Sequence, residues 1–302
     1  MITRCKLSPS GPEFSRLVYG TWRILDDGSS IQDLNRRLHR CVELGITTID
    51  TAEIYGLYAV EAVLGKALAL SPGLREKLEI VTKAGIYIPH AGSPGRKTAF
   101  YDVTSAQLIK SVDESLRLLG TDHVELFLVH RPDWLTSIDD TANGLNQLVR
   151  SGKIRSAGVS NYSATQFAAL NSRMQQSLVT NQLEFHLLHM DPIYDGTFDQ
   201  CQQLQVQPMA WSPLAGGRLF AKDNAVAVRL AQAAAEMSAR YHGATLEQLA
   251  YAWILAHPSH PLPVIGTNKI ERIESAAQAA GLSLSREDWY ALWVAATGHG
   301  IP

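Results

Sequence analysis

Four side chains that can do acid–base chemistry stand at or just after the ends of short β-rich runs. They are Asp50, Tyr55, Lys83 and His130. Taken singly, each has an ordinary explanation: a helix cap, a half-buried rim residue, a solvated strand end, or a hydrogen-bonded core histidine. Together they would place a carboxylate, a phenol, an ammonium group and an imidazole at one point. Core packing does not require that arrangement, because unpaired charge is rarely buried. The set therefore predicts a catalytic site.

The chemistry that these groups favour is proton transfer by the tyrosine. A free phenol has a pKa near 10, so its use near pH 7 leaves a gap of about 3 units, or roughly 4 kcal/mol. We expect Lys83 beside Tyr55 to stabilise the phenolate and narrow that gap, while Asp50 keeps Lys83 charged and oriented. His130 could donate a hydrogen bond to a substrate carbonyl oxygen and select its approach.

Such residues meet only if the fold brings several strand ends to one mouth. The sequence has eight β-rich runs, at residues 17–22, 47–52, 79–85, 124–131, 154–161, 179–185, 206–213 and 262–266. Several are apolar along their length, as parallel strands buried on both faces are. Eight β-then-α units in about 250 residues fit a (β/α)8 TIM barrel better than a doubly wound sheet, which usually has about six strands.

The segments between the runs have helical spacing, and several begin with capping-box pairs. These pairs are Thr104 with Gln107, Ser163 with Gln166, Thr245 with Gln248, and Asn268 with Glu271. Residues 3–14 predict an N-terminal β-hairpin over the bottom of the barrel, and residues 286–296 predict an extra C-terminal helix. No linker divides the chain, so we expect a single domain over residues 1–302.

Composition excludes several function classes. The 302 residues are 46% hydrophobic and 19% charged, with a formal net charge of −2. No global field would gather a nucleic acid or an acidic membrane surface. The three cysteines form no C-x-x-C pair, residues 1–6 lack the apolar core of a secretory signal, and prolines interrupt the uncharged stretch 248–268. We expect a cytoplasmic protein with a small-molecule partner and no membrane span; the oligomeric state is left open.

The chain resembles the aldo-keto reductase superfamily over nearly its whole length. The matching segments are TIDTAEIYG at 48–56, Lys83 at a strand end, LVHRPD at 128–133 and GVSNY at 158–162. The resemblance implies NADPH-dependent reduction of an aldehyde or ketone. It also implies that Asp50, Tyr55, Lys83 and His130 match the family's catalytic tetrad.

No G-x-G-x-x-G follows a strand, so a Rossmann site is unsupported. A barrel would instead hold a dinucleotide across its mouth, with phosphates near the seventh and eighth units. Candidate residues there are Ser212, Pro213, Leu214, Gly216, Arg218, Gly266, Thr267, Asn268 and Arg272. From the residues alone, the helix start near 268 is equally well a phosphate site or an ordinary cap with solvated cations. The resemblance favours the phosphate site, and hence NADP(H) over NAD(H).

The resemblance also implies contacts with the nicotinamide. Ser160, Asn161 and Gln182 would bond its amide, Trp211 would stack on its ring, and Gly20, Thr21 and Trp22 would line its edge. Two departures weaken or alter the implied contacts with the adenosine part. Gly266 stands where many family members have lysine, and Ser275 and Ala276 stand where an acidic residue and asparagine are common.

Two other function classes remain as alternatives. The chain could be an NADPH-binding sensor or regulatory subunit with little turnover, although the intact tetrad argues against this. A metal-dependent barrel hydrolase would need a histidine pair near the first strand, which residues 17–22 lack. His186 and His189 could share a helical face but have no third ligand nearby, so we expect no metal site. Trp134 and Tyr87 could wall the substrate pocket, or equally be a surface and a core aromatic.

Overall fold

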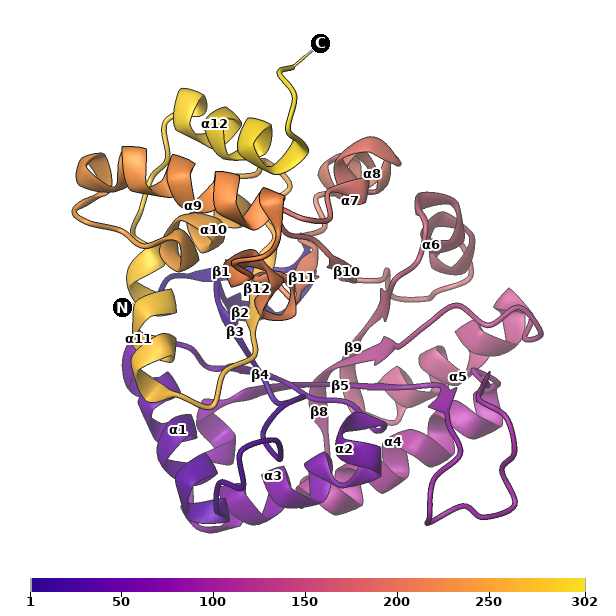
Figure 1. Cartoon of the computed structure of the whole chain (residues 1–302). Helices are drawn as coiled ribbons and strands as arrows, with labels where there is room; N and C mark the ends of the chain where they lie inside the picture. The colour runs from indigo at the N-terminus through magenta and orange to yellow at the C-terminus, as the bar shows by residue number, and fades with distance from the viewer. Residues whose placement is uncertain (1, 302) are drawn as a thin grey trace.

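The computed structural model describes residues 2–301, and its centre is a closed barrel of parallel strands (Figure 1). The strands are β3 (Val18–Gly20), β4 (Thr48–Asp50), β5 (Glu79–Ala84), β8 (Val124–Val129), β9 (Ile154–Ser160), β10 (Asn181–Glu184), β11 (Met209–Trp211) and β12 (Leu262–Ile265). They pair in chain order, and β12 closes the barrel on β3. Each lies inside one of the eight predicted runs, so the TIM barrel is confirmed.

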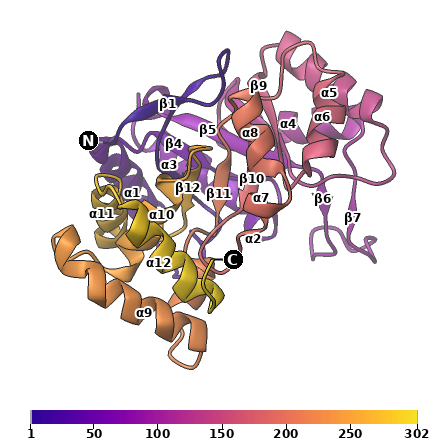
Figure 2. The ribbon, with the colours of Figure 1, turned by 90° about the horizontal axis from the view of Figure 1, so that it is seen from above.

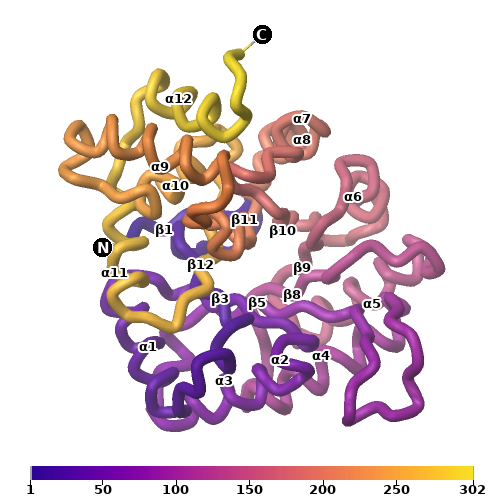
Figure 3. The backbone as a smooth tube through the Cα atoms, viewed as in Figure 1, coloured from indigo at the N-terminus to yellow at the C-terminus, as the bar shows by residue number. Residues whose placement is uncertain are grey.

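Helices surround the strands (Figures 1 and 3). They are α1 (Ile31–Leu44), α2 (Tyr55–Tyr58), α3 (Val60–Ala69), α4 (Ser105–Leu119), α5 (Ile138–Arg150), α6 (Ala164–Asn171), α7 (Asp191–Tyr194), α8 (Thr197–Leu204), α9 (Ala225–Ser238), α10 (Leu246–Leu255), α11 (Ile270–Ala279) and α12 (Arg286–Thr297). Three short 3₁₀ segments are η1 (Arg75–Lys77), η2 (Ala215–Phe220) and η3 (Ala239–Tyr241). The predicted extra C-terminal helix is α12, which packs against α9.

Local sequence explains where α1 starts and stops. Ser30 and Asp33 form a reciprocal capping box at its N-terminus, and Gly45 ends it in the left-handed conformation with φ 85°. Between them Leu34 and Leu38 recur at helical spacing and are fully buried against the barrel. Capping, apolar spacing and a terminal glycine together specify the helix.

The other predicted caps divide into two outcomes. The boxes at α6 and α10 form as predicted, with Ser163 and Gln166 in one and Thr245 and Gln248 in the other. At α4 only half of the box forms. Thr104 accepts from the Gln107 backbone, but the Gln107 side chain donates to the Tyr87 hydroxyl instead of returning to the cap.

The predicted hairpin closes the N-terminal end of the barrel. β1 (Arg4–Lys6) pairs antiparallel with β2 (Glu13–Ser15). Leu7 and Phe14 are fully buried and pack among the inward-facing strand residues, which include Met209. The hairpin thus fills the bottom with side chains and leaves the carboxyl ends of the strands as the open mouth.

One element after β5 is absent from the sequence prediction. β6 (Ile86–Tyr87) and β7 (Phe100–Tyr101) form a second antiparallel hairpin, which projects from the body of the molecule in Figure 2. Two-residue strands carry no periodicity that a sequence pattern can detect.

A buried carboxyl group holds α3 to the barrel wall. Glu61 is 2% exposed and accepts hydrogen bonds from Thr82 Oγ1 on β5 and Ser115 Oγ on α4, at 2.5 and 3.0 Å. Burial raises the pKa of Glu61 to about 7. The folded state therefore favours the protonated form.

This carboxyl predicts a pH-dependent stability. Its folded pKa lies above the unfolded value near 4.3, so its contribution is fully present below about pH 4 and is lost as pH rises through about 7. The loss amounts to about 3 kcal/mol by about pH 8.5. We expect Glu61→Gln to unfold in urea with a higher free energy than the unmodified chain at about pH 8.5, but not at about pH 5. The exposed Glu76→Gln is the control, and equal pH profiles for Glu61→Gln and the unmodified chain would contradict this role.

Candidate active site

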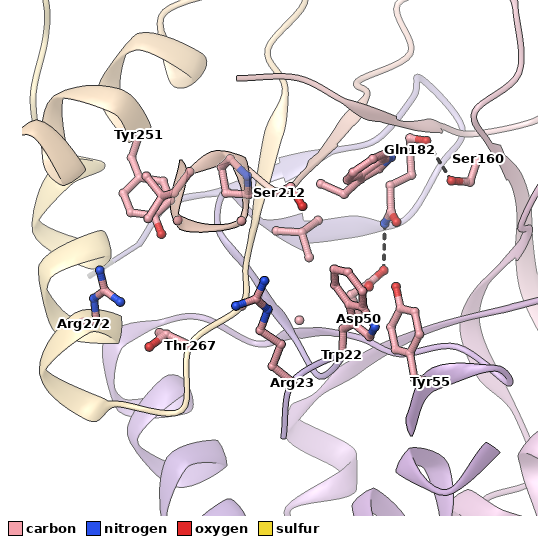
Figure 4. A pocket seen from close by; sticks show the side chains of 18 of the residues that line it. Trp22, Arg23, Asp50, Tyr55, Ser160, Gln182, Ser212, Tyr251, Thr267 and Arg272 are labelled. Carbon is pink, nitrogen blue, oxygen red and sulfur yellow. Dashed lines mark hydrogen bonds between the residues drawn. The ribbon is translucent and has the colours of Figure 1, made fainter. Parts of the chain in front are cut away.

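The carboxyl ends of the barrel strands surround a cavity of about 320 Å³ (Figure 4). The predicted residues that line it are Gly20, Trp22, Asp50, Tyr55, His130, Ser160, Asn161, Gln182, Trp211, Ser212, Pro213, Leu214, Gly216, Gly266, Thr267 and Arg272. Its volume lies in the usual range for small-molecule sites, roughly 300–1,000 Å³. The barrel therefore gathers residues that are far apart in the sequence around one space.

Lys83 lies beneath this cavity rather than on its wall. Its side chain is fully buried at the end of β5. The ammonium group donates to Asp50 Oδ1 at 2.7 Å, to the Thr51 carbonyl at 2.9 Å and to the Tyr55 hydroxyl at 2.9 Å. All three donors of the ammonium have acceptors, which allows the charge to be buried.

A sharp turn after β4 presents Tyr55. Gly56 and Leu57, inside the short α2, have non-helical φ values of 56° and 54°. Glycine adopts this left-handed conformation most readily, and a Cβ on Gly56 would lie 2.6 Å from Leu25 Cδ1 and would displace that side chain. The turn directs the phenol back over Lys83.

Asp50 is fixed from two sides. Its Oδ1 faces Lys83, while its Oδ2 accepts from Gln182 Nε2 on β10 at 2.8 Å (Figure 4). Ser160 Oγ donates to the backbone carbonyl of Gln182 at 2.9 Å and so ties β9 to β10 at this point. The carboxylate is thereby oriented, and one amide donor of Gln182 is committed to it.

Electrostatics around Tyr55 differ in one respect from the sequence expectation. Burial raises the pKa of Tyr55, and Asp50 adds to that, whereas Lys83 lowers it without reversing the shift. Burial lowers the pKa of Lys83, but Asp50 and Tyr55 more than offset it and leave that pKa above its ordinary value. Lys83 therefore does not bring the pKa of Tyr55 below that of an ordinary phenol, and the expected narrowing of its distance from pH 7 does not occur. The site holds a neutral phenol against a protonated ammonium.

His130 is a neutral imidazole at physiological pH. Burial lowers its pKa well below the ordinary value, and the positive charges of Lys83 and Arg131 lower it further. Its ring packs edge-on to Tyr55, with centroids 6.0 Å apart. Among residues 2–301, Nδ1 is buried without a hydrogen-bond partner. A neutral ring has a single N–H to donate.

Aromatic and amide groups form the neighbouring wall. Trp211 Nε1 donates to Asn161 Oδ1 at 3.0 Å, and Asn161 Nδ2 donates to Ser160 Oγ at 2.8 Å. Asn161 has a left-handed φ of 60°, which asparagine tolerates better than most residues. On the opposite side, Trp22 is 55% exposed at the mouth, and its ring centroid is 6.3 Å from that of Tyr55.

Three predicted cofactor residues lie outside the lining. Thr21 is fully buried, and its hydroxyl donates to the Asp50 carbonyl. Arg218 points toward Glu184, at 3.7 Å, and its Nε donates to the Ala215 carbonyl. The Asn268 side chain donates to a backbone carbonyl, as described next.

The predicted capping box of Asn268 and Glu271 is wrong. Lys269 is the N-cap of α11, and no side chain caps that helix. The Asn268 amide donates instead to the Arg23 carbonyl at 2.7 Å, because the β3 loop lies against this segment in the folded barrel. Asn268 therefore ties together two loops at the cavity mouth.

Several lining residues were not predicted. They are Arg23, Arg131, Gly217, Phe220, Glu247, Tyr251 and Val264. Arg23 and Arg131 directly follow predicted strand-end residues, so extending the same rule by one position would have found them. Glu247 and Tyr251 lie on α10, and nothing in a crossover helix's sequence shows that one turn faces the mouth.

The structure also shows where the two histidines and the two aromatic residues singled out in the sequence lie. His186 and His189 pair through their backbones in a tight turn, not on a helical face. Tyr87 is a buried core aromatic bonded to Ser111, and Trp134 is 84% exposed. None of these four lines the cavity.

Comparison with known proteins agrees with this geometry. Residues 16–293 match the model of the aldo/keto reductase family. The oxidoreductase YdhF of Escherichia coli is 44% identical over 304 residues, covering all of both chains. The chain belongs to the aldo/keto reductase family. A 6-dehydroglucose reductase of Agrobacterium fabrum is 44% identical over 96% of each chain. A thermostable aldo-keto reductase crystallised with the inhibitor epalrestat superposes with a TM-score of 0.81 at 29% identity, covering 97% of this chain and 100% of that one.

Family membership makes this aldo/keto reductase an oxidoreductase that acts on small carbonyl compounds. Within residues 2–301, no helix is both long and apolar enough to cross a bilayer.

The Lys83 contacts predict a strong effect on folding. Lys83→Met would leave the Asp50 carboxylate buried without a cation, which costs about 3–5 kcal/mol in comparable buried pairs. We expect urea unfolding at neutral pH to show that loss. The double variant Asp50→Asn with Lys83→Met should recover part of it, because the orphan charge is removed. Equal losses in the single and double variants would show that the ion pair does not govern stability here.

Proposed function

We propose that this aldo/keto reductase reduces aldehydes or ketones to alcohols with NADP(H), and that Tyr55 donates the proton. The observation that carries the proposal is the Tyr55 hydroxyl at the cavity mouth, 2.9 Å from the Lys83 ammonium, which Asp50 holds in turn. In that contact the fixed positive charge of Lys83 would stabilise the phenolate that Tyr55 becomes after it donates its proton.

The cavity lining fits a nicotinamide dinucleotide. One end offers the Trp211 ring beside the Asn161 amide, and the other offers Arg272 and Thr267. Between them lies the Ser212–Gly217 loop, in which the N–H groups of Ala215 and Gly217 are bonded within the loop and those of Leu214 and Gly216 are the candidate donors. A Cβ on Gly216 would lie 3.5 Å from the Arg23 guanidinium, so this cation stands beside the same loop. When bound, the nicotinamide supplies a hydride to the substrate carbon.

We assign the binding roles by this geometry and by the family pattern. Ser160, Asn161 and Gln182 would hold the carboxamide, Trp211 would stack on the ring, and Gly20 and Trp22 would line its edge. The loop containing Ser212, Pro213, Leu214 and Gly216 would take the pyrophosphate, with Arg23 in place of the predicted Arg218. Gly266 leaves room for the adenosine, and Thr267 and Arg272 would contact the 2′-phosphate.

The chain's own residues would carry the proton. As the substrate carbon is reduced, its oxygen becomes basic and takes the Tyr55 proton, while Lys83 stabilises the phenolate. Asp50 keeps Lys83 protonated and oriented. His130, being neutral, would donate its N–H to the same oxygen and fix the carbonyl's orientation. Solvent would then return a proton to the phenolate.

We further propose that sugar-derived aldehydes are among the substrates. The Agrobacterium fabrum relative is a 6-dehydroglucose reductase. Trp22 beside Tyr55 offers an exposed aromatic face, and Arg131 adds a polar group to the lining. Both suit a carbonyl compound that carries many hydroxyl groups.

Replacing Tyr55 with Phe tests the proposed proton donor. We expect turnover of a generic aldehyde with NADPH to fall by roughly 10²–10⁴-fold, since general acid catalysis contributes that much. NADPH binding, followed by quenching of tryptophan fluorescence, should stay nearly unchanged. Undiminished turnover in Tyr55→Phe would overturn the mechanism.

Turnover and nucleotide affinity together separate the enzyme from an NADPH-binding sensor. We expect oxidation of NADPH, followed by its absorbance, with several members of a panel of simple and sugar-derived aldehydes. Tight NADPH binding with no turnover on any member would favour the sensor.

A further inference from the structure

Arg272, the cation assigned to the 2′-phosphate, is already paired. Its Nε and Nη2 both donate to Glu247 Oε2 at 3.3 Å. Glu247 lies in the first turn of α10, and Arg272 in the first turn of α11, which packs beside α10. Both residues line the cavity. The site therefore contains a carboxylate as well as a guanidinium where the nucleotide's adenosine would lie.

The geometry of the pair sets up a competition. Nε and Nη2 form one of the two donor edges with which a guanidinium makes a two-bond contact to phosphate. Glu247 occupies that edge, and its side chain is only 15% exposed, so water screens it incompletely. The Arg272 guanidinium also lies 6.0 Å from the Phe220 ring, which limits its freedom to turn away.

Lys269, the exposed N-cap of α11, is the nearest other cation along the sequence, but it does not line the cavity. Arg23 does line the cavity, but it lies at the Gly216 loop, and Figure 4 shows it between Trp22 and Thr267 rather than beside Arg272. Gly266 contributes no side chain. The pair of Arg272 and Glu247 is neutral overall, whereas a 2′-phosphate brings between one and two negative charges.

We propose that Glu247 is a specificity-determining residue that weakens binding of 2′-phosphorylated nucleotides and narrows the preference for NADP(H) over NAD(H). An ionised carboxylate only accepts hydrogen bonds, so it repels a phosphate and can accept from the free 2′-hydroxyl of NAD(H). This inference rests on the proposed nucleotide-dependent function. A carboxylate that merely oriented Arg272 toward phosphate would act in the opposite direction.

Glu247→Gln removes the charge while keeping the size and an acceptor oxygen. We would measure dissociation constants for NADP⁺ and NAD⁺ by tryptophan quenching, since Trp22 and Trp211 line the cavity. Calorimetry with adenosine 2′,5′-bisphosphate and with 5′-AMP isolates the adenosine end. We expect the NADP⁺ constant to fall about tenfold in Glu247→Gln, with little change for NAD⁺. Glu247→Ala should tighten NADP⁺ similarly but weaken NAD⁺ by about threefold, because the acceptor is lost.

Glu271→Gln is the matched control. Glu271 is exposed in the first turn of α11 and does not line the cavity, so this substitution removes one negative charge nearby without changing the cavity wall. It should leave the ratio of the two dissociation constants unchanged. Weaker NADP⁺ binding in Glu247→Gln, or an unchanged ratio, would overturn the role of Glu247. Failure of the unmodified chain to bind either dinucleotide would instead overturn the proposed function.

Discussion

The buried contact between Lys83 and Asp50 is the constraint on which the rest of the site depends. Both side chains are almost fully excluded from water, at 0% and 2% exposure, with 2.7 Å between Nζ and Oδ1. Charges so placed are tolerated only when every donor and acceptor has a partner. Thr51 and Tyr55 complete the ammonium's set, and Gln182 completes the carboxylate's. The hydrogen bond that positions the Tyr55 hydroxyl is therefore one of those that stabilise the buried Lys83 ammonium.

The barrel supplies these partners because its parallel strands all end at one mouth. Lys83, Asp50 and Gln182 come from β5, β4 and β10, and only closure of the barrel brings β10 to face β4. The N-terminal hairpin fills the opposite end with Leu7 and Phe14. The hairpin therefore closes the bottom of the barrel, and the candidate catalytic side chains gather at the top.

Charge at the mouth is local and varies along it. The whole chain has a formal net charge of −2, so any attraction for a phosphorylated ligand must come from a few residues. Arg23 meets the loop that contains Gly216, and its carbonyl is tied to Asn268. Arg272, by contrast, shares its place with Glu247. Arg23, beside the middle of the cavity, can therefore meet an anion more freely than Arg272 can at the end proposed for the adenosine.

The sequence by itself determined the eight strand positions, the N-terminal hairpin and the C-terminal helix, and it singled out the four candidate catalytic side chains. It could do so because apolar spacing, caps and strand-end position are encoded within a few neighbouring residues. Only the tertiary structure decided that Arg218 turns to Glu184, that Asn268 bonds Arg23 instead of capping α11, and that Glu247 meets Arg272. It also decided that burial outweighs Lys83 in setting the Tyr55 pKa. Gln182 and Asp50 are 132 residues apart, and no local pattern records such a distance. Pair contacts and desolvation depend on which distant segments fold together, and that is fixed only when the barrel closes.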